Sequence, residues 1–335
     1  MKSNLTKTNY YKPKVFISIL NWNDVTNTIR CLDHILRQNY PNYSVVVVDN
    51  GSDDDSYKIL KELKRDFHLI RSEINLGYTG GNNIVIDYAL NNGADYVWLF
   101  NNDAIASQDM LSILVDESEK SPTIGIVGPL VKDLDSEATQ FAIGVFNLRT
   151  PVYRPIYNID EATQLIGSCE KNIAIVGTAM LIKRAVFEKI GKLDVDIFAY
   201  WEDIDFSIRS INAGFENSMS FATSLFHPCK DTKGDPRSVK PHYYYFMTRN
   251  EILMWRRYCP RVAYYRSIYW TFERQIGQIN RMPDYHEGVD AILAGIWDGI
   301  IGRGGPYLVS ARRPMGFLRI FMNIFQKIQS QNSIK

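Results

Sequence analysis

Short apolar segments and helical stretches alternate through the first 100 residues, and this alternation limits the fold more than any other feature of the chain. The apolar segments lie at 15–20, 45–48, 68–72 and 96–100. A spacing of about 25 residues leaves room for one helix between consecutive strands, as in the right-handed crossovers of a parallel sheet. The run VVVV (45–48) is apolar on both faces, which is typical of a central parallel strand. The sequence therefore predicts an α/β fold with a mainly parallel sheet.

A polar or glycine-rich cluster follows each predicted strand, at 21–23, 49–52, 75–83 and 101–103. A single cluster of this kind can simply cap the next helix. Four of them would meet at one edge, because parallel strands end on the same side of a sheet, and that edge is where open α/β sheets bind ligands. The pattern therefore favours a binding site at the carboxyl ends of the strands.

The second and third clusters suggest contacts with a nucleotide. Asp49 can accept hydrogen bonds from a base or a sugar hydroxyl, although an Asx-turn into the next helix is a structural alternative. The stretch NLGYTGGNN (75–83) places three glycines before an expected helix near 82–91, where backbone N–H groups can face a diphosphate. It matches neither the dinucleotide-binding nor the P-loop glycine pattern, so both of those sites are excluded.

The fourth cluster offers a ligand for a cation. Asp103 supplies one hard oxygen, which suits Mg²⁺ or Mn²⁺ with water and phosphate completing the shell. His227 ends a later predicted strand at 220–227 and could add a ligand or contact phosphate. A purely structural role for this histidine stays open.

A cluster of acidic residues begins the predicted helix at 203–215. Glu202, Asp203 and Asp205 would stabilise the helix N-terminus through its dipole. Trp201 beside them, however, provides a flat surface on which a sugar ring can lie. A carboxylate next to such a surface can act as general base toward a sugar hydroxyl.

The charge is unevenly distributed. The chain of 335 residues carries a formal net charge of +1, so we expect no nucleic-acid partner. From residue 253 onward, however, 12 Lys and Arg stand against 5 Asp and Glu. Segments 255–274 and 315–329 combine aromatic or apolar residues with arginine, which suits an anionic lipid interface. They could equally pack on the rest of the chain or on a second copy in a homodimer.

These features divide the chain into an α/β domain over 1–240, which carries the expected binding site, and a helical, basic and aromatic extension over 241–335. No apolar signal core and no run of 18 apolar residues is visible, so we expect a cytoplasmic protein, with peripheral contact to the inner face of the membrane as an additional expectation. Four cysteines lack metal-ligand spacing and are expected to be reduced, buried or incidental: Cys31, Cys169, Cys229 and Cys259.

Taken together and in this order, the clusters resemble the family 2 glycosyltransferases, and specifically the rhamnosyltransferase-like branch. The matching pieces are SILNWN (18–23), VVVVDNGSDD (45–54), NLGYTGGNN (75–83), WLFNNDA (98–104), GTAMLIKR (177–184), WEDIDFSIR (201–209) and YYYFMTRNEIL (243–253).

The resemblance implies a GT-A type, Rossmann-like fold that binds a UDP- or dTDP-sugar. It implies that Asp203 is the catalytic base of an inverting transfer to a hydroxyl of a glycan, lipid-linked in some relatives, in bacterial surface polysaccharide synthesis. The metal-binding D-x-D of the family is here Asn101-Asn102-Asp103, so Asp103 would hold Mg²⁺ or Mn²⁺ with help from His227. The first carboxylate of that motif is missing.

The resemblance also implies two further sets of site residues. The acceptor or the transferred sugar would contact Gly177, Thr178, Trp201 and Glu202. The nucleotide and diphosphate of the donor would contact Asn21, Trp22, Asn23, Asp49, Asn75, Gly77, Gly81, Asn82, Asn101, Asn102 and Arg249.

Two other functions compete with this one. A nucleotidyltransferase can use a similar sheet, but the lysine-rich loop that such enzymes carry near the N-terminus is absent from the sequence. A catalytically silent sugar-binding module could carry the same clusters, and hydrolysis of a nucleotide-sugar by the purified protein would separate it from an enzyme.

Overall fold

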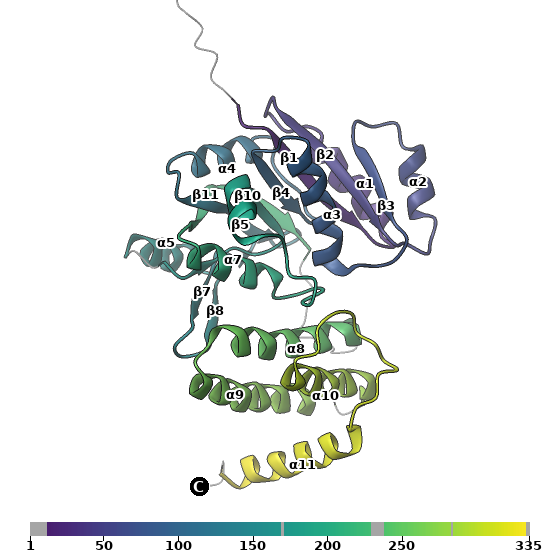
Figure 1. Cartoon of the computed structure of the whole chain (residues 1–335), viewed down its shortest axis with the longest axis vertical. Helices are drawn as coiled ribbons and strands as arrows, with labels where there is room; N and C mark the ends of the chain where they lie inside the picture. The colour runs from purple at the N-terminus through teal and green to yellow at the C-terminus, as the bar shows by residue number, and fades with distance from the viewer. Residues whose placement is uncertain (1–11, 169–170, 229–237, 283, 333–335) are drawn as a thin grey trace, which may run out of the picture.

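The computed structural model describes residues 12–168, 171–228, 238–282 and 284–332, and for 325–332 it describes the backbone alone. Figure 1 shows an α/β part built on a twisted sheet and, beside it, a group of helices formed by the last part of the chain. Helix α11 lies farthest from the sheet.

The main sheet has eight strands, with the order β11-β5-β10-β4-β1-β2-β3 and with β6 paired to β5. All neighbours run parallel except β10 and β6, which are antiparallel to their partners. The predicted mainly parallel α/β fold is therefore confirmed. The strands are β1 (Val15–Asn21), β2 (Tyr43–Asn50), β3 (His68–Ser72), β4 (Tyr96–Phe100), β5 (Ile124–Asp133), β6 (Thr139–Phe141), β10 (Ala179–Lys183) and β11 (Glu216–His227).

The central strands are buried on both faces, because helices cover each side of the sheet. Every residue of β4 is buried, and the four valines at 45–48 lie in the same core. Each covering helix turns an apolar face inward, as Cys31, Leu32 and Ile35 do in α1. The helices of this part are α1 (Val25–Ile35), α2 (Ser56–Glu62), α3 (Gly77–Asn91), α4 (Met110–Ser118), α5 (Ile159–Gly167), α6 (Arg184–Ile190) and α7 (Glu202–Asn212).

A small antiparallel sheet of three strands lies beside the main one, in the order β8-β7-β9. Residues 175–178, which include Gly177, separate β9 of this sheet from β10 of the main sheet. The strands of the small sheet are β7 (Ile143–Asn147), β8 (Val152–Ile156) and β9 (Ile173–Ala174).

The helices after residue 240 bury a core of their own, in which Tyr245 and Phe246 pack against Ile292 and Ile296. A third apolar cluster joins this group to the α/β part, because Met254 and Trp255 pack with residues of α7 and β7. The helices are α8 (Pro241–Tyr258), α9 (Arg261–Asn280), α10 (His286–Ile301) and α11 (Met315–Asn332).

Two smaller expectations concern cysteines and membrane spans. Cys31 is a buried free thiol and Cys259 a partly buried one, whereas Cys169 and Cys229 lie outside the described residues. Among the helices that the structure describes, none has the length and apolar character needed to cross a bilayer.

Candidate active site

A cavity of about 1710 Å³ lies between the carboxyl edge of the main sheet and the helices of the last part of the chain. The sheet edge contributes Trp22, Asn23, Asn75 and residues 101–103 to its lining. The opposite wall comes from α8 and α9, and residues 176–178 and 198–204 also line the cavity. The strand-end clusters therefore meet at a cavity, as the sequence predicted, but the helices complete it.

The Asn101-Asn102-Asp103 turn follows β4 and is held in place from three sides. The backbone N–H of Asn101 donates to the carbonyl of Thr178 at 3.0 Å, and the side-chain amide of Asn102 donates to the hydroxyl of Thr28 at 3.1 Å. Asp103 faces His227, with 3.2 Å between Oδ1 and Nε2. The turn thus presents one carboxylate, beside one imidazole, to the cavity.

Asp103 and His227 together offer one oxygen and one nitrogen ligand that a divalent cation could use. The Oε1 atom of Gln140 lies 3.4 Å from Nδ1 of His227 and can accept its proton, which leaves Nε2 as a ligand on the side of Asp103. Within the described ranges, no group of three or more His, Cys, Asp or Glu residues could hold a metal. Two protein ligands leave most of an octahedral shell for phosphate oxygens and water.

Glu202, which is buried, and Asp203, which is partly exposed, form a carboxylate pair at the start of α7. The backbone N–H groups of Gly177 and Ile204 each donate to Asp203 at 2.8 Å, to Oδ2 and Oδ1 respectively. Burial raises the pKa of Asp203, and these backbone hydrogen bonds oppose the rise. Burial together with the charge of Asp203 raises the pKa of Glu202 to about 8. One carboxylate of the pair is therefore suited to hold a proton near neutral pH and the other to accept one.

Gly177 lets the two carboxylates approach the β9–β10 connection. A Cβ atom at this position would lie 3.3 Å from Oε1 of Glu202 and 3.4 Å from Cβ of Asp203. A larger residue would therefore press directly on the pair.

The segment that leads into the pair has an unusual backbone. Phe198, Tyr200 and Trp201 have φ values of 67°, 64° and 72°, a region that bulky residues rarely adopt. Strain of this kind persists only where the surrounding structure enforces it, and it often occurs at functional sites. The residues that enforce it lie on α8.

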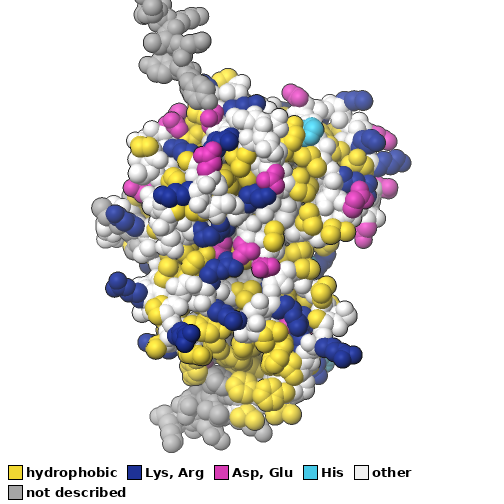
Figure 2. Space-filling view, in the orientation of Figure 1, with side chains coloured by type: hydrophobic (Ala, Val, Ile, Leu, Met, Phe, Trp, Pro, Cys, Tyr) yellow, Lys and Arg dark blue, Asp and Glu magenta, His cyan; other side chains and the backbone are white. Residues whose placement is uncertain are grey.

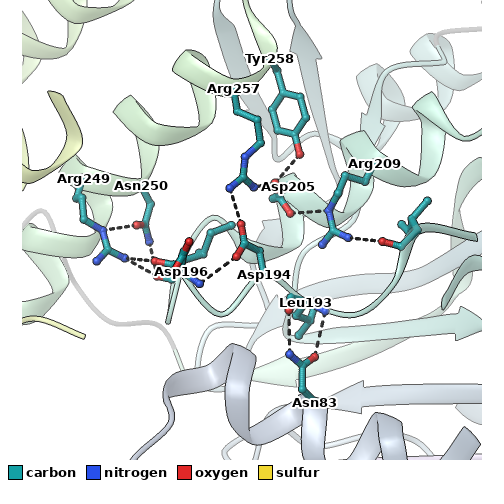
Figure 3. Close-up of polar contacts among 12 residues, drawn as sticks. Asn83, Leu193, Asp194, Asp196, Asp205, Arg209, Arg249, Asn250, Arg257 and Tyr258 are labelled. Atoms are coloured by element: carbon teal, nitrogen blue, oxygen red, sulfur yellow. Dashed lines mark hydrogen bonds and ion pairs between the residues drawn. The ribbon is translucent and has the colours of Figure 1, made fainter. Parts of the chain in front are cut away.

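Arg249 and Asn250 hold this segment from the side of α8 (Figure 3). The guanidinium of Arg249 donates to the backbone carbonyls of Asp196 and Ile197 and to Asn250, and it also bonds the carbonyl of Gly305. The side-chain amide of Asn250 donates to the carbonyls of Ile197, Ala199 and Tyr200. Both side chains are buried. We expected Arg249 to approach the diphosphate, but its contacts place it behind the segment that carries the carboxylates.

A second connection between α7 and α8 is ionic. Asp205, one turn into α7, accepts hydrogen bonds from Arg209 at 2.8 Å and from Arg257 at 2.9 Å, and also from the hydroxyl of Tyr258 (Figure 3). Arg257 also pairs with Asp194 at the beginning of the strained segment. The third acidic residue of the cluster therefore fastens α8 to α7 and does not line the cavity.

Four residues that we expected to contact the sugar donor do not line the cavity and lie behind its wall: Asn21, Asp49, Gly81 and Asn82. Asn21 donates to Asp49 at 2.9 Å, and both side chains are fully buried. We expected the third helix to begin near residue 82, after a glycine-rich loop. This prediction is wrong, because α3 begins at Gly77 and includes Gly81 and Asn82.

The amide groups at the start of α3 already have partners in the chain. The N–H of Gly77 donates to the side chain of Asn75, and that of Thr79 donates to the carbonyl of Phe198. Gly77 has φ +72° and admits Phe198, since a Cβ atom there would lie 2.4 Å from the carbonyl oxygen of Phe198. The glycines thus serve close packing, which their sequence pattern does not distinguish from phosphate binding.

Several cavity residues escaped the sequence prediction. The hydroxyl of Tyr78 donates to the carbonyl of Gly177 at 2.7 Å, next to the carboxylate pair. The ring of Trp201 lies 5.6 Å from that of Tyr153 on β8 and 6.2 Å from that of Trp255 on α8, measured between centroids. The abundance of aromatic residues after Lys240 was visible in the sequence, but nothing there related it to the cavity.

Comparison with known proteins gives one family and several relatives. The sequence profile of glycosyl transferase family 2 matches residues 16–191, more than half of the chain. An N-acetylglucosaminyl-diphospho-decaprenol L-rhamnosyltransferase of Mycobacterium tuberculosis is 26% identical over 243 residues, which cover 64% of this chain and 77% of the relative. The dTDP-rhamnosyl transferase RfbF of Shigella flexneri is 24% identical over 316 residues, covering 88% and 98%.

The fold also has a counterpart among solved structures. The mannosyltransferase PcManGT from Pyrobaculum calidifontis, solved in complex with GDP-Man and Mn²⁺, matches with a TM-score of 0.52 and 14% sequence identity. The match covers 94% of this chain and 81% of that one. The expected GT-A type architecture is thereby confirmed.

Proposed function

Since this chain belongs to glycosyl transferase family 2 and is a rhamnosyltransferase-like glycosyltransferase, we propose that it moves a sugar from a UDP- or dTDP-sugar to a glycan hydroxyl with inversion. The observation that carries this proposal is that one cavity holds both the Asp103–His227 pair and the Glu202–Asp203 pair. Such a transfer needs one group of residues that stabilises the negative charge on the leaving group and another that provides the general base.

The proposed reaction begins at Asp203. Its carboxylate removes the proton of the acceptor hydroxyl, whose oxygen forms a bond to the anomeric carbon from the side opposite the leaving group. The bond between that carbon and the diphosphate oxygen breaks, and the nucleoside diphosphate departs with the electron pair. Glu202, whose pKa is raised to about 8, stays protonated and can donate a hydrogen bond to the sugar.

The proposed donor lies along the sheet edge. Asn23, Asn75 and Asn101 line this part of the cavity, and Trp22, which is 45% exposed, offers a ring face to the base. Asp49 is fully buried behind this wall and does not line the cavity, so it supports the wall and does not contact the donor. Asn21, Gly81 and Asn82 support this wall from behind.

Asp103 and His227 would hold a divalent cation, Mg²⁺ or Mn²⁺, which would neutralise charge on the departing diphosphate. The solved mannosyltransferase carries Mn²⁺, which supports this proposal. Gly177, Thr178 and Trp201 would face the transferred sugar or the acceptor. We further propose that residues 1–240 are the catalytic domain and 241–335 the extension that completes its cavity.

The relatives suggest the setting of the reaction. One of them is described as acting on a decaprenol-linked diphosphate and another as a dTDP-rhamnosyl transferase. We propose that this chain likewise contributes to surface or cell-wall polysaccharide synthesis, with a glycan acceptor that is lipid-linked.

A screen for donor binding tests the function. We expect one UDP- or dTDP-sugar to raise the melting temperature in the presence of Mn²⁺ or Mg²⁺, because a ligand that binds only the folded state stabilises it. The same nucleotide-sugar should be hydrolysed slowly when no acceptor is present. GDP- and CMP-sugars serve as matched controls. Failure of every nucleotide-sugar to stabilise the protein would contradict the proposal.

The far end of the helical part carries an apolar surface with cationic neighbours. Figure 2 shows hydrophobic side chains gathered at the end of the molecule that α11 occupies, with Lys and Arg around them. Its members on α11 are well exposed: Phe317, Ile320, Phe321 and Ile324. Arg261, Arg266 and Arg312 are exposed on the same part of the chain. We propose that this surface rests on an anionic membrane, because lipid headgroups complement its charge.

Vesicle flotation tests the membrane contact. The full chain should float with phosphatidylglycerol vesicles at low salt and much less with phosphatidylcholine vesicles. Replacing both Phe317 and Ile320 by Ser should reduce flotation several-fold, whereas Asn323→Ser on the same helix should not. If the wild-type chain stays unbound at low salt, the surface has another partner. Loss of a dimer in the double variant would identify a second copy of the chain.

A further inference from the structure

The cavity is larger than a sugar donor requires. Its volume is about 1710 Å³, whereas sites for one small ligand usually measure about 300–1,000 Å³. The residues proposed for the donor all lie on the sheet edge or around the carboxylate pair. The part of the cavity that α8 and α9 line is therefore available to a second ligand.

Side chains from two facing helices line this part. On α8, Met247, Glu251 and Trp255 follow one another at intervals of four residues and so lie on one face. On α9, Ser267, Trp270 and Arg274 recur at intervals of three and four residues, which also places them on one face. These six residues form what we call the helical wall.

The helical wall combines a buried carboxylate with aromatic rings. Glu251 is only 6% exposed, and its carboxylate pairs with the guanidinium of Arg274, whose side chain is largely exposed. The guanidinium carbon of Arg266 lies 5.2 Å from the centre of the Trp270 ring and steadies that ring. A carboxylate and a guanidinium bind neighbouring hydroxyl groups, while a ring face accepts the C–H face of a sugar. This composition is suited to a carbohydrate.

The position of the helical wall relates it to the reaction. Trp255 contacts Trp201, which directly precedes the Glu202–Asp203 pair, so the wall begins next to the proposed base. Asp103 and His227 lie on the sheet-edge side of that pair. A molecule bound along the helical wall would thus approach the base from α8 and α9, whereas the proposed diphosphate site lies at the sheet edge.

We propose that the helical wall is a subsite for a sugar of the acceptor glycan, one unit away from the hydroxyl that reacts; this proposal rests on the function proposed above. The first acceptor sugar lies between Trp201 and the carboxylate pair, and the second stacks on Trp270 while Glu251 and Arg274 bind its hydroxyls. The enzyme therefore selects acceptors of two or more sugars over monosaccharides.

Calorimetric titration of the full chain tests the subsite, with the cation and donor nucleoside diphosphate present. The probes are four disaccharides and their parent monosaccharides: chitobiose with N-acetylglucosamine, cellobiose with glucose, lactose with galactose, and rhamnobiose with rhamnose. We expect at least one disaccharide to bind about tenfold more tightly than its monosaccharide, since each tenfold corresponds to about 1.4 kcal/mol of added contact. Trp270→Ala and Arg274→Gln should each remove most of that advantage.

The matched control is Tyr269→Ala, which removes an exposed ring from the same helix without touching the cavity. It should leave the advantage of the disaccharide unchanged. Nucleotide-sugar binding by each variant reports its folding, and if Arg274→Gln does not fold, Trp270→Ala alone decides. A wild-type chain that binds no donor contradicts the proposed function. Normal donor binding with no preference for any disaccharide, or with a preference that survives Trp270→Ala, overturns the subsite.

Discussion

Replacement of Asp203 by Asn should lower the rate of glycosyl transfer by about 10²–10⁴-fold, the usual loss when a general base is removed. An amide cannot take the proton of the acceptor hydroxyl. Donor binding should change only a few-fold, because the proposed ligands of the cation and diphosphate are Asp103 and His227 and do not include Asp203. The measurement is the initial rate of transfer, compared with the dissociation constant of the nucleotide-sugar.

The fold should survive this change. The Asp203→Asn side chain keeps one oxygen that can accept from the N–H groups of Gly177 and Ile204, and it loses the other acceptor. The neutral amide, however, avoids the desolvation cost that burial imposes on the carboxylate. We therefore expect the free energy of unfolding to change by less than about 3 kcal/mol. Asp116→Asn, on the exposed face of α4, is the matched control and should leave the rate unaltered. A near wild-type rate in the Asp203 variant would remove Asp203 from the mechanism.

The pH dependence of the rate follows from the same pair. Burial raises the pKa of Asp203, so protons occupy the proposed base at pH values where an exposed aspartate is already charged. The base is active without its proton, and the rate should therefore rise with pH over a range that lies above the ordinary aspartate pKa of about 4. Because Glu202 and Asp203 interact, the pH profile reports the pair as a unit.

Asp103→Ala should weaken binding of the nucleotide-sugar by at least about 10- to 100-fold at a fixed Mn²⁺ concentration. Mutation of a residue that only supports the metal ligands already lowers metal affinity by about that much. Nucleoside binding should stay nearly unchanged, since the nucleoside lacks the diphosphate. Titrations of the nucleotide-sugar and of the nucleoside, with Mn²⁺ and with EDTA, give the comparison.

Asp55→Ala is a matched control, because this exposed aspartate lies outside the cavity. His227→Ala should show a smaller loss in the same direction, since the imidazole is the second of two protein ligands in this proposal. If the wild-type chain binds the nucleotide-sugar equally well with Mn²⁺ and with EDTA, the Asn-Asn-Asp form of the motif works without a cation.

The sequence determined the elements that carry the site, because their signals are local. Strands β1 to β4 and their spacing follow from runs of apolar residues, and β3 and β4 begin and end at the residues expected for them. The polar clusters after β1, β2 and β4 could be placed together from the order of the strands alone, since parallel strands share an edge. Asp103 and Asp203 were selected from their motifs and from the resemblance to the family, and both line the cavity.

Short-range sequence patterns were less reliable where the same pattern fits two different roles, phosphate binding and close packing. The glycines of 75–83 fit a phosphate-binding loop and a helix start that packs closely against another segment, and the structure has the second. Arg249 fits a phosphate ligand, yet it is buried behind the strained segment. In each case the deciding partner, Phe198 or Ile197, lies about 50 or more residues away in the sequence.

Tertiary structure alone decided how the catalytic pair is presented. The left-handed conformations of Phe198, Tyr200 and Trp201 cost energy locally and have no signature in the sequence. They persist because Arg249 and Asn250, on a helix that packs from the other part of the chain, bind the carbonyl groups of that segment. The helical wall of the cavity arises in the same way, since packing of α8 against α7 brings residues beyond 240 next to Asp203.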